Sequence, residues 1–135
     1  MGNQERRLGG LVVDQPNFLG LAQHERVLIA LKPGEALFAE GSNGACMYVV
    51  RAGTIRVGSG NTVYEDVEAG GIVGEMAIIE DAPRSATATA LTACEVAEID
   101  RKRFDFLVQQ TPHFARNVMK VLSRRLREMN ERYRY

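Results

Sequence analysis

Short apolar runs separated by glycine-containing turns fill the chain between residues 26 and 99, and they constrain the fold more than any other feature. Runs of this kind are typical of strands in an antiparallel sandwich or roll. The pair Pro33-Gly34 and the segments 41–44 and 59–61 supply turn residues between them. The sequence therefore predicts a mainly β fold, with strands at residues 26–31, 36–39, 46–50, 54–57, 62–64, 85–91 and 94–99.

After the predicted strands, the apolar period changes to that of helices. Asp100 is a suitable N-cap for a first short helix that carries Phe104, Phe106 and Leu107. Thr111-Pro112 ends this helix and starts a long one, and we expect Pro112 to occupy its first helical position. The pattern thus places a short helix and a long C-terminal helix, about residues 112–135, after the sheet.

The long helix carries an apolar seam with alternating spacings of four and three residues. This spacing continues for about two and a half heptad repeats. The seam consists of Ala115, Met119, Leu122, Leu126, Met129 and Tyr133. One interpretation packs the seam on the chain's own sheets; the other, which we favour, is a parallel contact with a second copy. In the second case we expect the charged residues to form a solvated shoulder of the helix: Arg124, Arg125, Arg127 and Glu128.

The N-terminal residues 1–20 are expected to form an arm outside the main domain, which spans residues 21–135. Residues 1–10 are polar and glycine-rich, and they predict a loose segment. Pro16 and Gly20 interrupt residues 11–21, so we expect at most a short turn of helix there. Met1-Gly2 begins like a myristoylation site, but Arg6 stands where that signal needs Ser or Thr.

Composition excludes several classes of protein. The 135 residues suit one domain, and 17 basic against 17 acidic residues give no chain-wide basic field for nucleic acid. No apolar run approaches the roughly 20 residues of a membrane span, and no secretory leader is visible. Cys46 and Cys94 are too few and too far apart for a zinc site, so we expect buried, reduced thiols in a cytoplasmic protein.

Residues 70–90 hold the side chains of greatest chemical interest. The guanidinium fork of Arg84 suits a phosphate, and the hydroxyls of Ser85 and Thr87 add donors. Glu75 precedes a short apolar run that can form about two turns of helix, whose first amides also favour an anion. An ionised carboxylate only accepts hydrogen bonds, so Glu75 suits a sugar hydroxyl. A phosphate at one end and a ribose at the other describe a nucleotide.

The segments Gly74-Glu75-Met76-Ala77-Ile78-Ile79 and Pro83-Arg84-Ser85-Ala86-Thr87 resemble the phosphate-binding cassette of the cyclic nucleotide-binding domain family. The resemblance runs over about residues 27–130, and the stretch 92–99 looks like the catabolite activator branch of that family. It implies an antiparallel β-roll of the jelly-roll type, followed by the two helices, and a homodimer through the long one. The family usually opens with a longer helical segment than this chain offers, so the N-terminal contacts are expected to differ. Activators of that branch carry a helix-turn-helix domain after the long helix, and we expect none here.

The resemblance also implies a set of site residues. Arg84, Ser85 and the amides near Gly74 would hold the cyclic phosphate, and Glu75 would accept from the ribose 2′-hydroxyl. Met129 and Asn130 fall where catabolite activator relatives contact the base. The predicted ligand-binding residues are Val73, Gly74, Glu75, Met76, Ala77, Arg84, Ser85, Ala86, Met129 and Asn130. Cyclic AMP is the expected regulatory ligand, with cyclic GMP as the alternative.

Two other classes of function remain as alternatives. A dimerising scaffold could keep the roll without binding nucleotide, with Glu75 and Arg84 as a structural ion pair. An enzyme of the double-stranded β-helix kind would need a metal triad, whereas His24 and His113 lie far apart and are expected at the surface. We therefore predict no catalytic site and no metal. A one-domain sensor must act on another, unidentified protein, unless the chain is part of a longer regulator.

Overall fold

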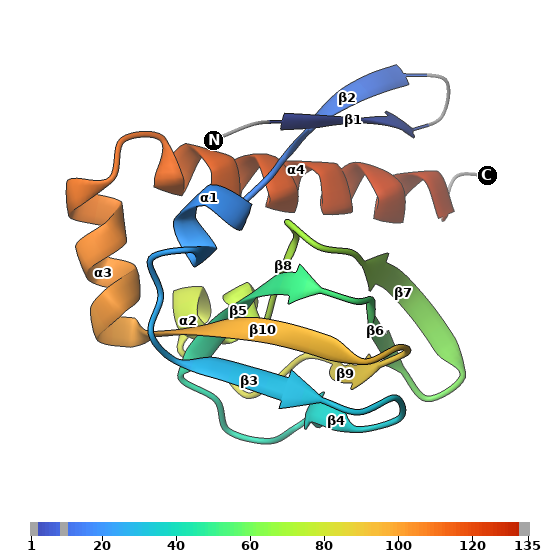
Figure 1. The fold of residues 1–135 in the computed structure, drawn as a ribbon. Helices are drawn as coiled ribbons and strands as arrows, with labels where there is room; N and C mark the ends of the chain where they lie inside the picture. Colours follow the sequence, from blue (N-terminus) through green and yellow to red (C-terminus); the bar gives the residue numbers. More distant parts are fainter. Residues whose placement is uncertain (1–2, 9–10, 133–135) are drawn as a thin grey trace.

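The computed structural model describes residues 3–8 and 11–132, with side chains from Gln15 onward. Two four-stranded antiparallel sheets form a roll, with strand orders β3-β10-β5-β8 and β4-β9-β6-β7 (Figure 1). The strands are β3 (Leu28–Leu31), β4 (Ala36–Phe38), β5 (Cys46–Ala52), β6 (Ile55–Ser59), β7 (Thr62–Val67), β8 (Ile72–Val73), β9 (Thr87–Ala90) and β10 (Cys94–Asp100). This architecture confirms the predicted β-roll and most of the predicted strand positions.

Strand β5 is buried on both faces and joins two apolar clusters. Tyr48 and Val50 point into a cluster between the two sheets, whereas Met47 and Val49 point toward the helices. Alternate side chains of a strand point to opposite faces, so a continuous apolar run indicates burial on both sides. The cluster between the sheets contains Leu31, Tyr48, Val50, Ile55, Val67, Val73, Ala88, Ala90, Cys94 and Val96. The cluster under the helices contains Phe18, Ala22, Met47, Val49, Ile72, Ile78, Ala97, Ile99, Leu107, Phe114, Val118 and Val121.

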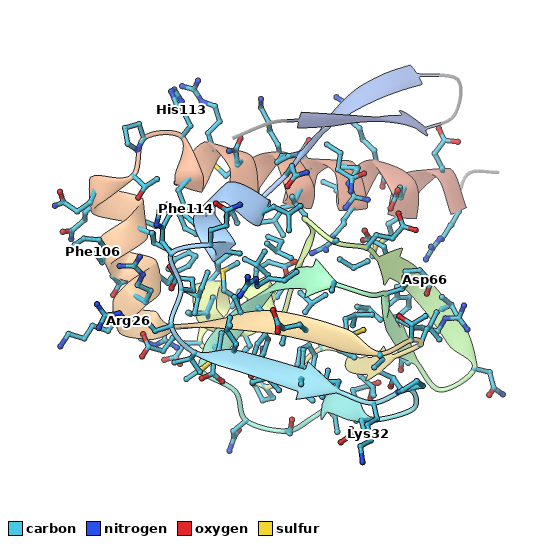
Figure 2. All side chains as sticks on the ribbon, in the orientation of Figure 1. Arg26, Lys32, Asp66, Phe106, His113 and Phe114 are labelled. Carbon is cyan, nitrogen blue, oxygen red and sulfur yellow. The ribbon has the colours of Figure 1, made fainter. Side chains whose placement is uncertain are left out.

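Four helices accompany the roll in the described residues: α1 (Leu19–Ala22), α2 (Glu75–Glu80), α3 (Arg101–Gln110) and α4 (Phe114–Arg132). Asp100 caps α3 as predicted, because its Oδ1 accepts a hydrogen bond from the Arg103 amide at 2.7 Å. The predicted start of the long helix is wrong. α4 begins at Phe114, and Pro112 lies in the preceding turn, where His113 adopts a left-handed φ of 68°. Figure 2 shows His113 on the outer side of this turn, while Phe114 points inward to the buried cluster.

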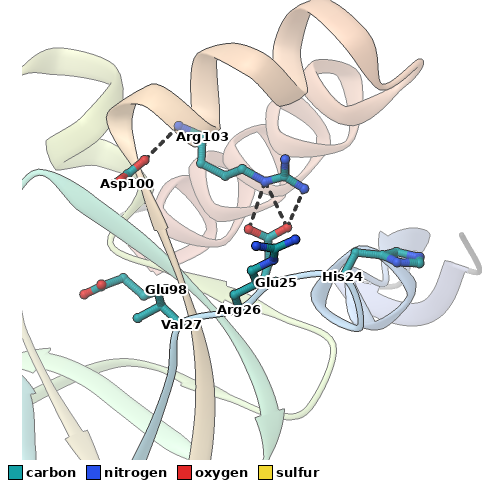
Figure 3. Close-up of a pocket in the computed structure, with 7 residues that line it drawn as sticks. All are labelled: His24, Glu25, Arg26, Val27, Glu98, Asp100 and Arg103. Atoms are coloured by element: carbon teal, nitrogen blue, oxygen red, sulfur yellow. Dashed lines mark hydrogen bonds and ion pairs between the residues drawn. The ribbon is translucent and has the colours of Figure 1, made fainter.

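An ion pair ties α3 to the segment after α1. Arg103 donates from Nε to both carboxylate oxygens of Glu25, at 3.0 and 3.1 Å, and from Nη2 at 2.9 Å (Figure 3). Glu25 is buried and Arg103 is partly exposed. Paired carboxylates of this kind are tolerated in a protein interior because the guanidinium fork satisfies both oxygens. The bond therefore holds the α3–α4 elbow against the chain that enters the roll.

The N-terminal arm has more regular structure than the sequence predicted. Strands β1 (Asn3–Leu8) and β2 (Leu11–Pro16) pair antiparallel, and β2 runs against α4 (Figure 1). The expectation of a loose segment is wrong for these residues; Met1-Gly2 and Gly9-Gly10 lie outside the described part of the chain. A Gly-Gly pair between two strand-like segments is a known signal for a β-hairpin. The polar composition of residues 1–10 favoured a loose segment instead, and the signal was missed. The short helix α1 agrees with the single turn expected over 11–21.

Three members of the apolar seam of α4 are largely exposed, whereas Leu122 packs against the cluster under the helices. Met119, Leu126 and Met129 are 60%, 59% and 55% exposed, whereas Val118 and Val121 on the adjacent face are buried. Ala115 and Leu122 are partly buried, and Tyr133 lies outside the described residues. The interpretation in which the seam covers the sheets is therefore wrong for its three most exposed members.

The remaining expectations concern thiols and histidines. Both cysteines are unpaired; Cys94 is buried and Cys46 is partly buried. Burial and the nearby Glu98 carboxylate raise the pKa of the Cys46 thiol, which favours its protonated form. His24 and His113 are exposed, as predicted. Among the described helices, none combines the length and the apolar character that crossing a bilayer requires.

Candidate functional site

A cavity of about 340 Å³ lies between α2, the loop that follows it, strand β7 and the C-terminal half of α4. Nine of the ten predicted ligand-binding residues line it: Val73, Gly74, Glu75, Met76, Ala77, Arg84, Ser85, Ala86 and Met129. Asn130 is exposed and does not line it. Sequence reasoning missed seven lining residues, namely Phe38, Val57, Tyr64, Glu65, Arg125, Glu128 and Arg132. The structure therefore brings the two cassette segments and α4 together around one cavity.

Gly74 fixes the geometry at the start of α2. It has a φ of 79°, a left-handed conformation that a residue with a side chain rarely adopts. A Cβ at this position would also lie 2.6 Å from Nη1 of Arg84, so the end of the arginine side chain would have to move. The glycine of the Gly-Glu pair is thus favoured by its backbone conformation and allows the close approach of Arg84. The guanidinium therefore lies beside the residue that starts α2.

Arg84 is buried at the cavity without a carboxylate partner among the described residues. Its Nη1 donates to the Gly74 carbonyl at 3.0 Å, and its guanidinium carbon lies 4.2 Å from the centre of the Phe38 ring. Its Nε has no hydrogen-bond partner. A Cβ on Gly44 would lie 2.2 Å from this nitrogen, so Gly44 also shapes the arginine's surroundings. A buried cation without a counter-charge is costly, and an anionic ligand would remove that cost.

Glu75 is paired with α4 rather than with Arg84. Its carboxylate, 4% exposed, accepts from Nη1 of Arg125. Arg125 also donates to the Ile72 carbonyl at 2.7 Å and to Oε1 of Glu65 at 2.9 Å. The structural Glu75–Arg84 ion pair considered from the sequence is absent from the structure. The ribose acceptor predicted from the sequence is instead held by an arginine of the long helix.

The expected solvated shoulder of α4 is wrong for Arg124, which is 2% exposed. It donates to Oε2 of Glu65 at 2.9 Å and to Oε1 of Glu128 at 3.2 Å. Burial alone would raise the pKa of Glu65, but Arg125 and Arg124 outweigh it and hold that pKa below its ordinary value. The residue that could have revealed this is Arg124 itself. It continues the three- and four-residue spacing of the buried α4 positions Phe114, Asn117, Val118 and Val121.

The cavity offers a cation at one end, a carboxylate near it, and apolar surface between them and α4. Val73, Ala86 and Met129 supply apolar walls, and Tyr64 adds an aromatic ring. Arg132 reaches from α4 to the Tyr64 carbonyl, so the helix is bonded to both β7 and the cassette. Such a cavity suits a small ligand with an anionic group, hydroxyls and a flat apolar body. No group of three His, Cys, Asp or Glu residues is placed to hold a metal ion in the part of the chain with described side chains.

Comparison with protein families gives the same result as the geometry. Residues 28–111, more than half of the chain, match the family model described as "Cyclic nucleotide-binding domain". The chain belongs to the cyclic nucleotide-binding domain family. The family likeness that the cassette predicted from the sequence is confirmed.

Similar proteins include a receptor, an activator and an enzyme. The "Cyclic AMP receptor protein" of Thermus thermophilus is 31% identical over 126 residues, which cover 84% of this chain and 58% of the receptor. The crystal structure of the Thermus thermophilus catabolite activator protein matches with a TM-score of 0.75 at 26% identity, over 84% of this chain and 56% of that one. An EAL enzyme in its cGMP-bound form matches with a TM-score of 0.61 at 25% identity, over 78% of this chain and 29% of the enzyme. The chain thus spans about half the length of these curated relatives.

Proposed function

We propose that this chain is a regulatory sensor domain that binds cyclic AMP, with cyclic GMP as the weaker ligand, and signals by moving α4. The observation that carries this function is the buried Arg84, which lines the cassette cavity without a carboxylate partner in the described residues. A cyclic phosphate carries one negative charge on exposed oxygens, and it would complete the hydrogen bonds of the guanidinium. The preference for adenine rests on the similarity to the Thermus cyclic AMP receptor protein.

In this proposal the cyclic phosphate lies against Arg84, with bonds from the Ser85 hydroxyl and from amides between Gly74 and Ala77. The ribose 2′-hydroxyl donates to Glu75, and the base lies between Ala86 and Met129. All of these residues line the same cavity. Asn130 is exposed beside Met129, so it reaches the base only if α4 turns.

The coupling from ligand to helix runs through Glu75. This carboxylate bonds Arg125 of α4, so a ribose hydroxyl at Glu75 would compete with or reorient that bond. A ligand shifts a conformational equilibrium only by the difference in its contacts with the two states. Glu75 provides such a difference, because it touches the ligand site and the helix at once. The exposed seam at Met119, Leu126 and Met129 would pass the movement to a second copy in a homodimer.

In this proposal the signal then passes to an effector that the described residues do not identify. The unpaired thiols of Cys46 and Cys94 suit a reducing compartment, and we place the protein in the cytoplasm. The proposed role is regulatory rather than enzymatic, because the cavity supplies binding groups and a link to α4.

Isothermal titration with cyclic AMP and cyclic GMP tests the proposal. We expect saturable binding, tighter for cyclic AMP, and a loss of about ten- to hundredfold in Arg84→Ala, since a charge-assisted bond contributes roughly 1.5–3 kcal/mol. Arg56→Ala is the matched control, because Arg56 is exposed and pairs only with Asp66 on the neighbouring strand. Absence of heat and of any thermal shift with millimolar nucleotide would contradict the proposal and favour a scaffold without ligand.

A further inference from the structure

A second cavity, about 650 Å³ in volume, lies where α1, α3 and the first turns of α4 meet. Its apolar floor includes Leu21 of α1, Leu107 of α3 and Pro112 from the turn between the helices. It shares no lining residue with the cassette cavity. The two cavities are nevertheless connected by α4, whose N-terminal half lines this one and whose C-terminal half lines the other.

The rim of this cavity is basic. Arg116 and Lys120 lie one turn apart on α4, and both are exposed and lack a carboxylate partner among the described residues. Arg103 also lines the cavity, but Glu25 already neutralises its charge (Figure 3). No described acidic residue lines the cavity, so its two unpaired cations dominate the local field.

Asn117 is the observation that points to a ligand. The residue is only 8% exposed, yet its side-chain amide lines the cavity and bonds no other described residue. Its backbone amide donates to the His113 carbonyl at 2.8 Å. The polar atoms of the side chain are not fully enclosed, so they are open to the cavity, where water or a ligand can satisfy them.

We propose that this cavity is a binding site for a small organic phosphate, separate from the nucleotide site. Lys120, the Arg116 fork and the Asn117 amide can each donate hydrogen bonds, and the N-terminus of the 19-residue α4 adds a partial positive charge. A phosphate monoester offers several acceptor oxygens with a double negative charge, which matches these donors. Its carbon body lies on the floor formed by Leu21, Leu107 and Pro112.

The test is a titration with phenyl phosphate, in which binding is monitored through the amide resonances of residues 111–120 in nuclear magnetic resonance spectra. We expect saturable shifts that are centred on the side-chain amide of Asn117 and weaker binding of inorganic phosphate, which lacks the apolar body. Arg116→Ala with Lys120→Ala should weaken phenyl phosphate at least tenfold. Asn117→Leu should weaken it several-fold, since it removes the buried donor.

Two control variants keep the result specific. Arg127→Ala removes an exposed arginine of α4 that lines neither cavity, and it should leave the affinity for phenyl phosphate unchanged. Arg84→Ala should also leave it unchanged, so failure of the nucleotide proposal would not affect this one. The proposal is overturned if residues 111–120 show no saturable shift at about 10 mM phenyl phosphate. Equal affinity in the double variant and in Arg127→Ala, or equal shifts with phenol, would overturn it as well.

Discussion

Arg84 and Arg124 are both buried, at 5% and 2% exposure, but they differ in their partners. Arg124 bonds two carboxylates, those of Glu65 and Glu128, whereas the side chain of Arg84, among the residues with described side chains, bonds only the Gly74 carbonyl and lies over the Phe38 ring. If Arg84 is kept for a ligand, it should contribute little to the stability of the ligand-free fold. We predict that Arg84→Met and Arg124→Met will have very different effects on the free energy of unfolding.

The magnitudes follow from these contacts. Arg84→Met removes one charged hydrogen bond, roughly 1.5–3 kcal/mol, and a cation–π contact of about 0.5–2 kcal/mol. It also removes the desolvation penalty of an uncompensated ion, which is several kcal/mol, so the net change should stay within about 1 kcal/mol. Arg124→Met removes one hydrogen-bonding partner from each of two carboxylates, which should lower the free energy of unfolding by about 3–5 kcal/mol. We expect a decrease near the lower end of this range, because Arg125 still pairs with Glu65.

Urea unfolding at one fixed protein concentration measures both changes. At a cyclic AMP concentration about 100 times the dissociation constant, the wild type should gain about 2.7 kcal/mol, and Arg84→Met should gain none at the same concentration. An Arg84→Met protein that is destabilised as much as Arg124→Met would refute the reasoning. Arg84 would then be a structural residue, and its lack of a carboxylate partner would carry no information about a ligand.

Three further predictions concern the ribose, the dimer and acid stability. Glu75→Ala should weaken cyclic AMP while sparing its 2′-deoxy analogue in titration calorimetry; equal losses would remove Glu75 from the ribose. Met119→Asp with Leu126→Asp should convert a dimer to a folded monomer in light scattering, because both residues are exposed members of the seam. A wild type that is monomeric at tens of micromolar, with and without nucleotide, would contradict the dimer. The pKa of Glu65 lies below its ordinary 4.5, so its stabilising contribution is present above that pH and is lost as pH falls through the folded value. Glu65→Gln should therefore lose less stability than the wild type between about pH 6 and about pH 3 in urea unfolding, and an identical loss would exclude this role.

Features set by neighbouring residues could be predicted from the sequence. The alternation of Met47, Tyr48, Val49 and Val50 in strand β5 follows from the period of a strand, and the Asp100 cap depends on residues three positions apart. The cassette segments 74–79 and 83–87 were identified by the resemblance of their residues, at fixed spacing, to the phosphate-binding cassette of the family. In each case a short stretch of chain contains all the information that its local structure requires.

Features that depend on distant partners could not be predicted. Arg124 looked like a surface charge, because its carboxylate partner Glu65 lies 59 residues earlier in the chain. The bond from Arg125 to Glu75 spans 50 residues and gave no local signal. The departure at Pro112 has another cause: a proline suits a helix start, but the left-handed His113 delays the helix to Phe114. Tertiary contacts thus decided the chemistry of α4, while local pattern decided its existence.

The most direct measurement of the central claim is the side-chain Nε–H resonance of Arg84 during a titration with cyclic AMP. This nitrogen is buried and has no hydrogen-bond partner among the residues with described side chains. If the cyclic phosphate binds here, the resonance should move in a saturable way, together with the amides of Glu75, Met76 and Ser85. If cyclic AMP binds while the Arg84 signal stays unchanged, or if no resonance moves at millimolar nucleotide, the assignment of this cavity as the nucleotide site is contradicted.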